Sequence, residues 1–139
     1  MPGQKARVAP PTPGREALAP FHEGLERGEL RVARCTACGR LRFPPRVVCG
    51  GCASPEPPDW VAVSGRGRVW SYAIFHKQYL AEGPQVPYNV AVVALDEGPR
   101  LISTVVSGTS GDVEVDMPVQ AVFEQSNGRA VVKFRPADA

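Results

Sequence analysis

The chain has 139 residues, of which 43% are hydrophobic and 22% are charged. These values are those of one ordinary globular domain or two very small ones, and they exclude a collagen-like or wholly disordered chain. The formal net charge of +2 is too small to indicate nucleic-acid binding by itself. No apolar run approaches the roughly 20 residues of a membrane helix, and the N-terminus has no apolar signal-peptide core. We therefore expect a soluble, cytoplasmic protein.

The first 29 residues divide into a tail and a short helix. Residues 1–14 are rich in proline and glycine and lack apolar periodicity, which predicts a flexible tail or the remnant of a linker. Residues 15–29 predict a helix, because Phe21 and Leu25 fall at helical spacing and Gly28 is suited to end it. A helix this short is stable only when its apolar face packs on the rest of the protein.

Four cysteines form the strongest motif, in a segment predicted as a zinc ribbon over residues 30–55. Cys35 and Cys38 make one C-x-x-C pair, and Cys49 and Cys52 make a second pair after ten intervening residues. Two such knuckles at this separation are typical of a tetrahedral structural zinc site, with no position left for an activated water. Two disulfides and a rubredoxin-type iron centre are the alternatives, and disulfides are disfavoured without an export signal.

The positive charge is concentrated in the same segment. From Leu30 through Pro55 there are five arginines and no acidic residue, whereas from Trp60 onward seven basic residues accompany eight acidic ones. The arginines offset the negative charge of a Zn(Cys)4 centre, or they form a phosphate-binding surface, because guanidinium forks match phosphate oxygens. They are Arg31, Arg34, Arg40, Arg42 and Arg46.

The remainder, residues 59–136, is predicted to be all β and follows the turn-rich connector Ser54–Asp59. Arg68–Lys77 is apolar on both faces, which predicts a long curved strand covered on two sides. About five strands, the first long and bent, are typical of an OB-like barrel, and a small SH3-like barrel is the competing assignment. The candidate strands are Trp60–Ser64 with Arg68–Lys77, Asn89–Leu95, Leu101–Ser107, Val119–Gln125 and Ala130–Arg135.

Residues suited to catalysis are scarce. The cysteines are assigned to the metal, and neither His22 nor His76 belongs to a recognisable catalytic or metal-binding motif. We interpret Asp96 and Glu97 as the solvated tip of a hairpin. His76 and Lys77 end a strand before a loop that contains glycine and proline, which makes this rim a candidate binding element.

Many short motifs follow one another from Phe21 to Pro136. They are Gly28-Glu29-Leu30, Arg34-Cys35-x-x-Cys38-Gly39, Arg42-Phe43-Pro44-Pro45-Arg46, Cys49-x-x-Cys52, Ser64-Gly65-Arg66-Gly67, Trp70-Ser71-Tyr72, Pro87-Tyr88, Leu95-Asp96-Glu97-Gly98-Pro99-Arg100, Met117-Pro118-Val119 and Phe134-Arg135-Pro136. In this order they resemble domain-of-unknown-function family 35. The sequence departs from that family at His22, where Trp often follows the Phe, and at Asp116, where Gly usually precedes Met-x-Val.

The resemblance implies a mainly β fold, with an N-terminal helix, a rubredoxin-like zinc ribbon and a five-stranded OB-fold barrel. It also implies a non-catalytic subunit, in a heterotetramer with a thiolase-like protein that supplies the catalytic residues. The subunit would help form the partner's acyl-CoA site, with retro-aldol cleavage in steroid side-chain degradation as the leading reaction. The alternatives are a plain docking scaffold and a nucleic-acid-binding zinc-ribbon/OB module, and the slightly acidic barrel argues against the second.

Coenzyme A carries a 3′-phosphate, a diphosphate and an adenine, which arginine forks and an aromatic ring can bind. We therefore assign acyl-CoA binding to Arg42, Phe43 and Arg46, or to His76 and Lys77 on the barrel rim. The candidate partner contacts on the helix are Phe21, His22 and Leu25.

Overall fold

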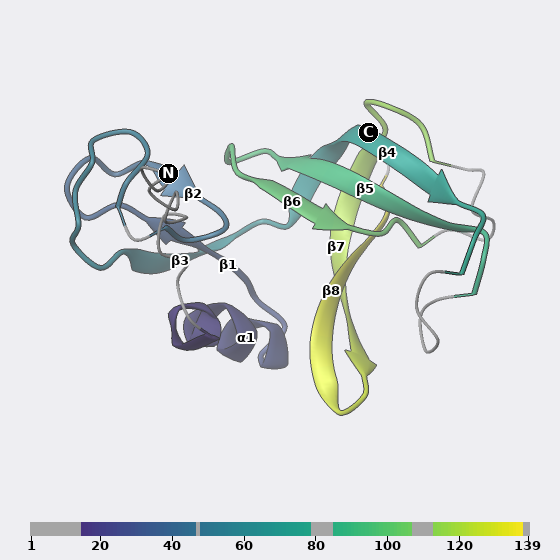
Figure 1. The fold of residues 1–139 in the computed structure, drawn as a ribbon, viewed down its shortest axis with the longest axis horizontal. Helices are drawn as coiled ribbons and strands as arrows, with labels where there is room; N and C mark the ends of the chain where they lie inside the picture. Colours follow the sequence, from purple (N-terminus) through teal and green to yellow (C-terminus); the bar gives the residue numbers. More distant parts are fainter. Residues whose placement is uncertain (1–14, 47, 79–84, 107–112, 138–139) are drawn as a thin grey trace, which may run out of the picture.

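The computed structural model describes residues 15–46, 48–78, 85–106 and 113–137. In chain order the elements are a 3-10 turn (Arg15–Leu18), α1 (Ala19–Glu26), β1 (Leu30–Arg34), β2 (Leu41–Arg42), β3 (Asp59–Val63), β4 (Arg66–Phe75), β5 (Tyr88–Leu95), β6 (Arg100–Ser103), β7 (Pro118–Ser126) and β8 (Arg129–Pro136). A ribbon with the helix below it lies beside a barrel (Figure 1). The predicted fold class, mainly β with an N-terminal helix, is confirmed. Within the described ranges, no helix is long and apolar enough to cross a membrane.

Helix α1 has the ends that its sequence predicts. Pro20 lies in the first turn, where its missing N–H has no helical partner to lose. Gly28, with a φ of +74°, adopts the left-handed conformation just past the other end. Phe21 and Leu25 are buried on the face toward the core. The helix prediction is confirmed, and the tail predicted over residues 1–14 lies outside the described residues.

The ribbon's sheet has three strands in the order β2-β1-β3. β1 pairs antiparallel with β3 along its whole length, from Leu30↔Val63 to Arg34↔Asp59. The expected strand at Trp60–Ser64 is present as β3, and its backbone pairs with β1 of the ribbon's sheet. β2 has two residues and pairs with the end of β1, at Ala33 and Arg34. The connector Ser54–Asp59 stays a prediction as a domain boundary.

The second sheet has the order β6-β5-β4-β7-β8 and is antiparallel throughout. Beyond β6 the chain meets β8 through a parallel bridge between Val105 and Phe134. There the Val106 N–H donates to the Phe134 carbonyl at 2.6 Å, and the Phe134 N–H donates to the Thr104 carbonyl at 3.0 Å. These bonds nearly close the sheet, which confirms the five-stranded OB-like barrel. The predicted turn Ser107–Asp112 lies outside the described residues.

The long strand β4 differs from its prediction. It carries a bulge between Val69 and Ser71, and its middle is not covered on both faces. Trp70 is 53% exposed and Tyr72 is 41% exposed. A bulge inserts one unpaired residue and breaks the in-out alternation, so the burial of this strand could not be extrapolated from a regular period of two.

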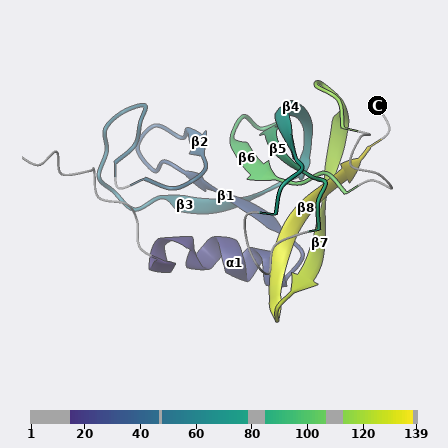
Figure 2. The same ribbon diagram turned by 45° about the vertical axis from the view of Figure 1, so that its right-hand side comes forward.

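One apolar core joins the ribbon, the helix and the barrel. Phe134, Val69 and Val119 are fully buried in the barrel, and Phe21 and Leu25 of α1 belong to the same cluster. Figure 2 shows α1 running beneath the ribbon toward the β7–β8 hairpin. A hydrogen bond of 2.9 Å from the Ala130 N–H to the Glu26 carboxylate joins the helix to this hairpin.

Asn89 is a buried polar side chain at the closure of the barrel. Its amide donates to the Val105 carbonyl at 2.9 Å, and its oxygen accepts from the Val105 N–H at 2.8 Å and from the Thr104 hydroxyl at 3.0 Å. The side chain thus supplies the hydrogen bonds that a neighbouring strand would otherwise provide.

The hairpin between β5 and β6 also contacts the start of the barrel. The backbone N–H of Ser64 donates to the Glu97 carboxylate at 2.8 Å, while Asp96 is exposed. Both Asp96 and Glu97 are exposed, as predicted for a solvated tip, and the Glu97 carboxylate also accepts hydrogen bonds from Ser64 in the turn between β3 and β4.

Candidate metal centre and arginine cleft

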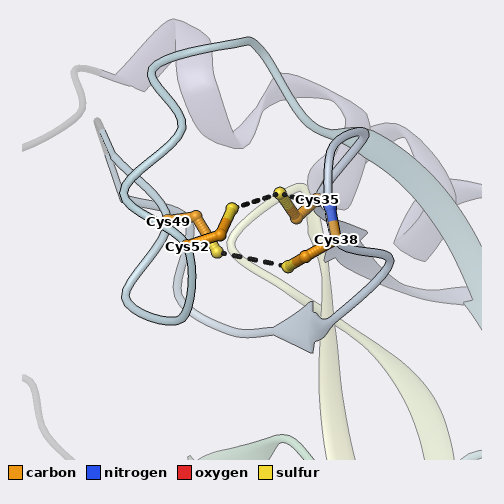
Figure 3. Close-up of side chains that lie close together, drawn as sticks. All are labelled: Cys35, Cys38, Cys49 and Cys52. Carbon is orange, nitrogen blue, oxygen red and sulfur yellow. Dashed lines mark hydrogen bonds between the residues drawn. The ribbon is translucent and has the colours of Figure 1, made fainter.

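The two C-x-x-C turns bring their sulfur atoms together. Cys35 follows the end of β1, and Figure 3 shows the side chains of the first pair facing those of the second. The Cys35 and Cys52 sulfurs are 3.6 Å apart, and the Cys38 and Cys49 sulfurs are 3.7 Å apart. All four sulfurs lie within 4.8 Å of one another. The four residues that the sequence singled out thus converge on one point.

This geometry fits a tetrahedral metal ion. Zinc–thiolate bonds of about 2.3 Å require sulfurs about 3.8 Å apart, close to the two distances above. The four cysteines are not joined by disulfides, which removes that alternative. Four thiolates fill a tetrahedral coordination sphere, so the centre is suited to hold the ribbon together and leaves no position for a substrate.

Backbone N–H groups turn toward the sulfurs and stabilise their charged form. The Cys38 N–H lies 3.5 Å from the Cys35 sulfur, and this contact is the main reason that the pKa of Cys35 is lowered. At the second turn, hydrogen bonds from the backbones of Cys52 and Gly51 lower the pKa of Cys49 to about 6. The turns therefore favour the thiolate, the form that binds metal, at Cys35 and Cys49. At Cys52 the backbone hydrogen bond with Ser54 lowers the pKa, but the neighbouring cysteine sulfurs, Cys35 first, outweigh it and raise the pKa to about 11.

The structure divides the five ribbon arginines into two groups. Arg31 forms an ion pair with Glu29 at 2.9 Å, and Arg34 forms one with Asp59 at 3.6 Å. Both carboxylates lie just outside the acid-free segment of the sequence. Glu29 lies two residues before Arg31 in the chain, and strand pairing brings Asp59 to Arg34, so both arginines have an acidic partner.

The other three arginines gather around a cleft of about 450 Å³ between the ribbon and the β5–β6 turn. Arg100, the first residue of β6, adds a fourth guanidinium, and no Asp or Glu lines the cleft. In the described part of the chain none of the four forms a salt bridge. The lining residues are Arg40, Leu41, Arg42, Phe43, Pro44, Arg46, Gly50, Gly51, Gly98, Pro99 and Arg100.

Two guanidinium nitrogens of Arg42, Nε and Nη1, are buried donors without a hydrogen-bond partner in the described part of the chain. Leaving a buried donor unpaired costs about 1–3 kcal/mol, and more for a charged group.

Two neighbouring contacts hold cleft arginines in place. The guanidinium of Arg100 lies 3.9 Å from the centre of the Trp70 ring, a cation–π contact. Arg40 lies against Gly51 so closely that a Cβ at this glycine would be 3.0 Å from Nη1. The sequence analysis included Arg40 among the candidate phosphate-binding arginines but missed Arg100 and Trp70 as site residues, because the turn that carries Arg100 reaches the ribbon only through the tertiary fold.

The two sets of residues predicted to bind acyl-CoA lie apart. His76 and Lys77 follow β4 at the end where Phe75 pairs with Tyr88, whereas the cleft lies at the other end of the β4–β5 pair. At about 3.3 Å per residue, the ends of β4 are separated by more than about 20 Å. His76 and Lys77 are exposed and cannot line the same cleft as Arg42.

Of the remaining predicted site residues, three are partly or fully buried and one, on α1, is exposed. Phe43 lines the cleft, but its ring centre is 4.7 Å from that of Phe21, so one side of the ring packs in the core. Phe21 and Leu25 are buried, which leaves little of either side chain for a partner to contact. His22 is exposed on α1 and is the member of the predicted partner set that faces solvent.

A metal-holding ribbon joined to an OB-like barrel is the class of protein that the fold and the cysteine site define. Two family models match the same halves: "ChsH2, rubredoxin-like zinc ribbon domain" over residues 22–58 and "ChsH2, C-terminal OB-fold domain" over residues 60–124. A "DUF35 domain-containing scaffold protein" of Methanocaldococcus jannaschii is 34% identical over 100 residues, which are 72% of this chain and 71% of that protein. The chain belongs to the DUF35 family, and the resemblance to family 35 is confirmed.

Other relatives have names that refer to CoA thioesters. A "Probable enoyl-CoA hydratase alpha subunit" of Thermomonospora curvata is 33% identical over 136 residues, 96% of this chain but only 42% of that protein. The "Benzoylsuccinyl-CoA thiolase subunit BbsA" of Thauera aromatica is 28% identical over 111 residues, covering 76% of this chain and 74% of that one. A solved chain of the "Ltp2-ChsH2(DUF35) aldolase" superposes with a TM-score of 0.78 at 33% identity, over 91% of this chain and 98% of that chain.

Proposed function

We propose that this protein is a non-catalytic accessory subunit that binds a thiolase-like enzyme and helps form its acyl-CoA site, in a cytoplasmic heterotetramer. The observation that carries the proposal is the similarity to the Ltp2-ChsH2(DUF35) aldolase over nearly the full length of both chains. The name of the Thauera relative, a thiolase subunit, supports the class of partner.

The reaction of the complex is carbon–carbon bond cleavage or formation on a CoA thioester. Retro-aldol cleavage in steroid side-chain degradation is our leading choice, supported by the aldolase relative. The thiolase relative supports thiolysis as the competing reaction. The chain's own residues bind and position in either case, and the partner supplies the nucleophile and the acid and base groups.

We assign roles to the residues as follows. The four cysteines hold a structural zinc ion, for which their sulfur spacing is suited. Arg42 and Arg46 contact acyl-CoA, with Phe43 as an apolar wall, and the exposed pair His76 and Lys77 forms a second polar site on the rim. His22 gives α1 an exposed ring at the partner surface.

The test is purification of a tagged chain from its native host at moderate salt, with mass spectrometry of what stays bound. A stoichiometric thiolase-like chain is the expected result, and the complex should act on a CoA thioester while neither chain does so alone. Recovery of RNA or of DNA-handling proteins without an acyl-CoA enzyme would overturn the proposal. A steep salt dependence of single-strand binding, with a slope of several units, would point the same way.

A further inference from the structure

We infer that the outward face of the sheet formed by β4, β5 and β6 docks a partner protein whose contact surface is apolar at its centre and carries carboxylates along one edge. That this partner is the thiolase-like chain rests on the proposed function, whereas the position and chemistry of the surface are argued from the face itself. Figures 1 and 2 show these three strands in the upper part of the barrel and α1 in the lower part of the molecule. The main residues of this outer face are Arg68, Trp70, Val92, Ala94, Arg100 and Ile102.

The register of the strands shows which side chains share this face. Val92 of β5 lies between Ser71 of β4 and Ile102 of β6. Residues paired directly across a sheet project to the same side, so these three form one row. The neighbours of Val92 in β5, Ala91 and Val93, are both 0% exposed in the core. The row of Val92 therefore points away from the core.

Two large apolar side chains on the outer face are open to solvent. Ile102 is 74% exposed, and Trp70, the unpaired residue at the bulge of β4, is 53% exposed. Arg100 connects them, because it lies two residues before Ile102 on β6 and its guanidinium is 3.9 Å from the centre of the Trp70 ring. Exposed apolar side chains that gather beside charged ones mark protein contact sites.

The next row of the face is positively charged. Arg68, Ala94 and Arg100 lie opposite one another on the three strands, and none of these strands contains an Asp or Glu. Neither arginine forms a salt bridge within the described residues, although Asp96 lines a cleft together with Arg68. A second copy docked through the same face would bring arginines to arginines, whereas a different protein can supply the complementary carboxylates.

The same side chains favour a protein over a single-stranded nucleic acid. Bases bind such sheets by stacking on free aromatic rings, but Arg100 already lies over the ring of Trp70. The aliphatic side chains of Val92 and Ile102 have no aromatic face to offer. Tryptophan and arginine are enriched at the energetic centres of protein interfaces.

Helix α1 offers a smaller contact surface. Phe21 and Leu25 are buried, so His22 is the exposed member of the set predicted on the helix. The outer face presents two exposed apolar side chains on paired strands, whose backbone is already ordered, and docking there costs less ordering entropy. The main contact with the partner therefore lies on the barrel.

The experiment uses the thiolase-like chain that co-purifies with the wild-type protein, titrated calorimetrically into zinc-loaded full-length variants. Ile102→Lys should weaken binding at least about thirtyfold, as for the loss of a central interface side chain. Arg100→Glu should weaken it about tenfold, and Arg100→Lys, which keeps the charge, should retain most of the affinity. Phe123→Lys is the matched control, because it adds the same charge at a partly exposed apolar residue outside the three strands, and it should bind normally.

Zinc content and the thermal midpoint identify any variant that fails to fold. Hydroxyl-radical footprinting needs no variant at all. Trp70 should be oxidised readily in the free wild-type chain and should be protected in the complex.

Normal binding by Ile102→Lys, or a Trp70 that stays reactive in the complex, would overturn the inference while the proposed function stands. Loss of binding in His22→Glu but not in Ile102→Lys would place the contact on α1 and overturn it equally. A dimer of the isolated chain that Ile102→Lys dissociates, or a single-stranded oligonucleotide that this variant no longer binds, would assign the face to another occupant. If no thiolase-like chain co-purifies with the wild-type protein, the proposed function fails, and this occupant of the face fails with it.

Discussion

The ribbon and the barrel are stabilised by different means. The ribbon has a three-stranded sheet with one strand of two residues, and both of its long turns converge on four sulfurs. The barrel has five longer strands around the fully buried side chains Phe134, Val69 and Val119. A segment of about 30 residues cannot bury enough apolar surface to fold alone. The ribbon adds Leu30 and Val32 to the shared core, and its cysteine site is suited to supply the rest of its stability through a metal.

The largest expected effect tests whether the ribbon depends on its metal centre while the barrel does not. Cys49→Ser removes a ligand from the metal centre, so it should release zinc and unfold the ribbon, because metal-binding free energy is folding free energy in such modules. Trp60 lies in the ribbon's sheet and Trp70 in the barrel. Trp70→Phe and Trp60→Phe chains therefore give separate fluorescence reports. We expect the Trp60 signal to be lost and the Trp70 signal to persist.

Ala37→Ser, between two ligands of the first knuckle and exposed, is the matched control and should retain its zinc. If both tryptophan signals disappear together in Cys49→Ser, the ribbon and the barrel are one cooperative unit and the contrast between them is wrong.

Truncation of a core side chain in the barrel should have the second-largest effect on the free energy of unfolding. Phe134→Ala removes a ring that is 0% exposed and should destabilise the protein by about 3–5 kcal/mol. Phe123→Ala on the neighbouring strand β7 removes a ring that is 36% exposed and should cost about 1 kcal/mol or less. Urea unfolding measures both. If both variants lose the same free energy of unfolding, the apolar core does not lie around Phe134 as its burial indicates.

The closure of the barrel depends on one polar side chain. Asn89→Leu leaves the N–H and carbonyl of Val105 without the partners they have now, and we expect a loss of about 2–4 kcal/mol. Hydrogen exchange at the Val105 amide should accelerate with it. Thr104→Val removes just the outer bond to Asn89 and should cost about 1 kcal/mol. Unchanged protection at Val105 in Asn89→Leu would mean that the strand ends close the barrel without it.

The smallest expected effect concerns the hydrogen bond between helix α1 and the β7–β8 hairpin of the barrel. Glu26→Ala removes the acceptor of the Ala130 N–H and should cost about 1 kcal/mol. Glu23→Ala on the same helix removes an exposed ion pair with Arg27 and should cost at most about 0.5 kcal/mol. Thermal unfolding of both variants is the measurement. Equal shifts would show that the hydrogen bond adds nothing to the docking of α1.

The sequence could predict the elements that local signals define. Gly28 ends the helix, paired cysteines define a metal site, and the turns Asp96–Pro99 and Ser126–Gly128 mark hairpins. It could not predict the partner of Trp60–Ser64, because a five-residue apolar strand fits either sheet and the choice depends on which edge is free. It also could not predict the exposure of Trp70, because a bulge has no reliable signature in composition.

The amino-acid sequence by itself determined the mainly β class, the four metal ligands and the excess of arginine in one segment, because each depends on residue type and short spacing. The tertiary structure decided that Arg34 lies beside a carboxylate and that other arginines of the segment face a cleft. Strand pairing brings Asp59 to Arg34, and the fold of the β5–β6 turn brings Arg100 to Arg42. Contacts between residues so far apart in the chain depend on the packing of two sheets, which no local pattern encodes.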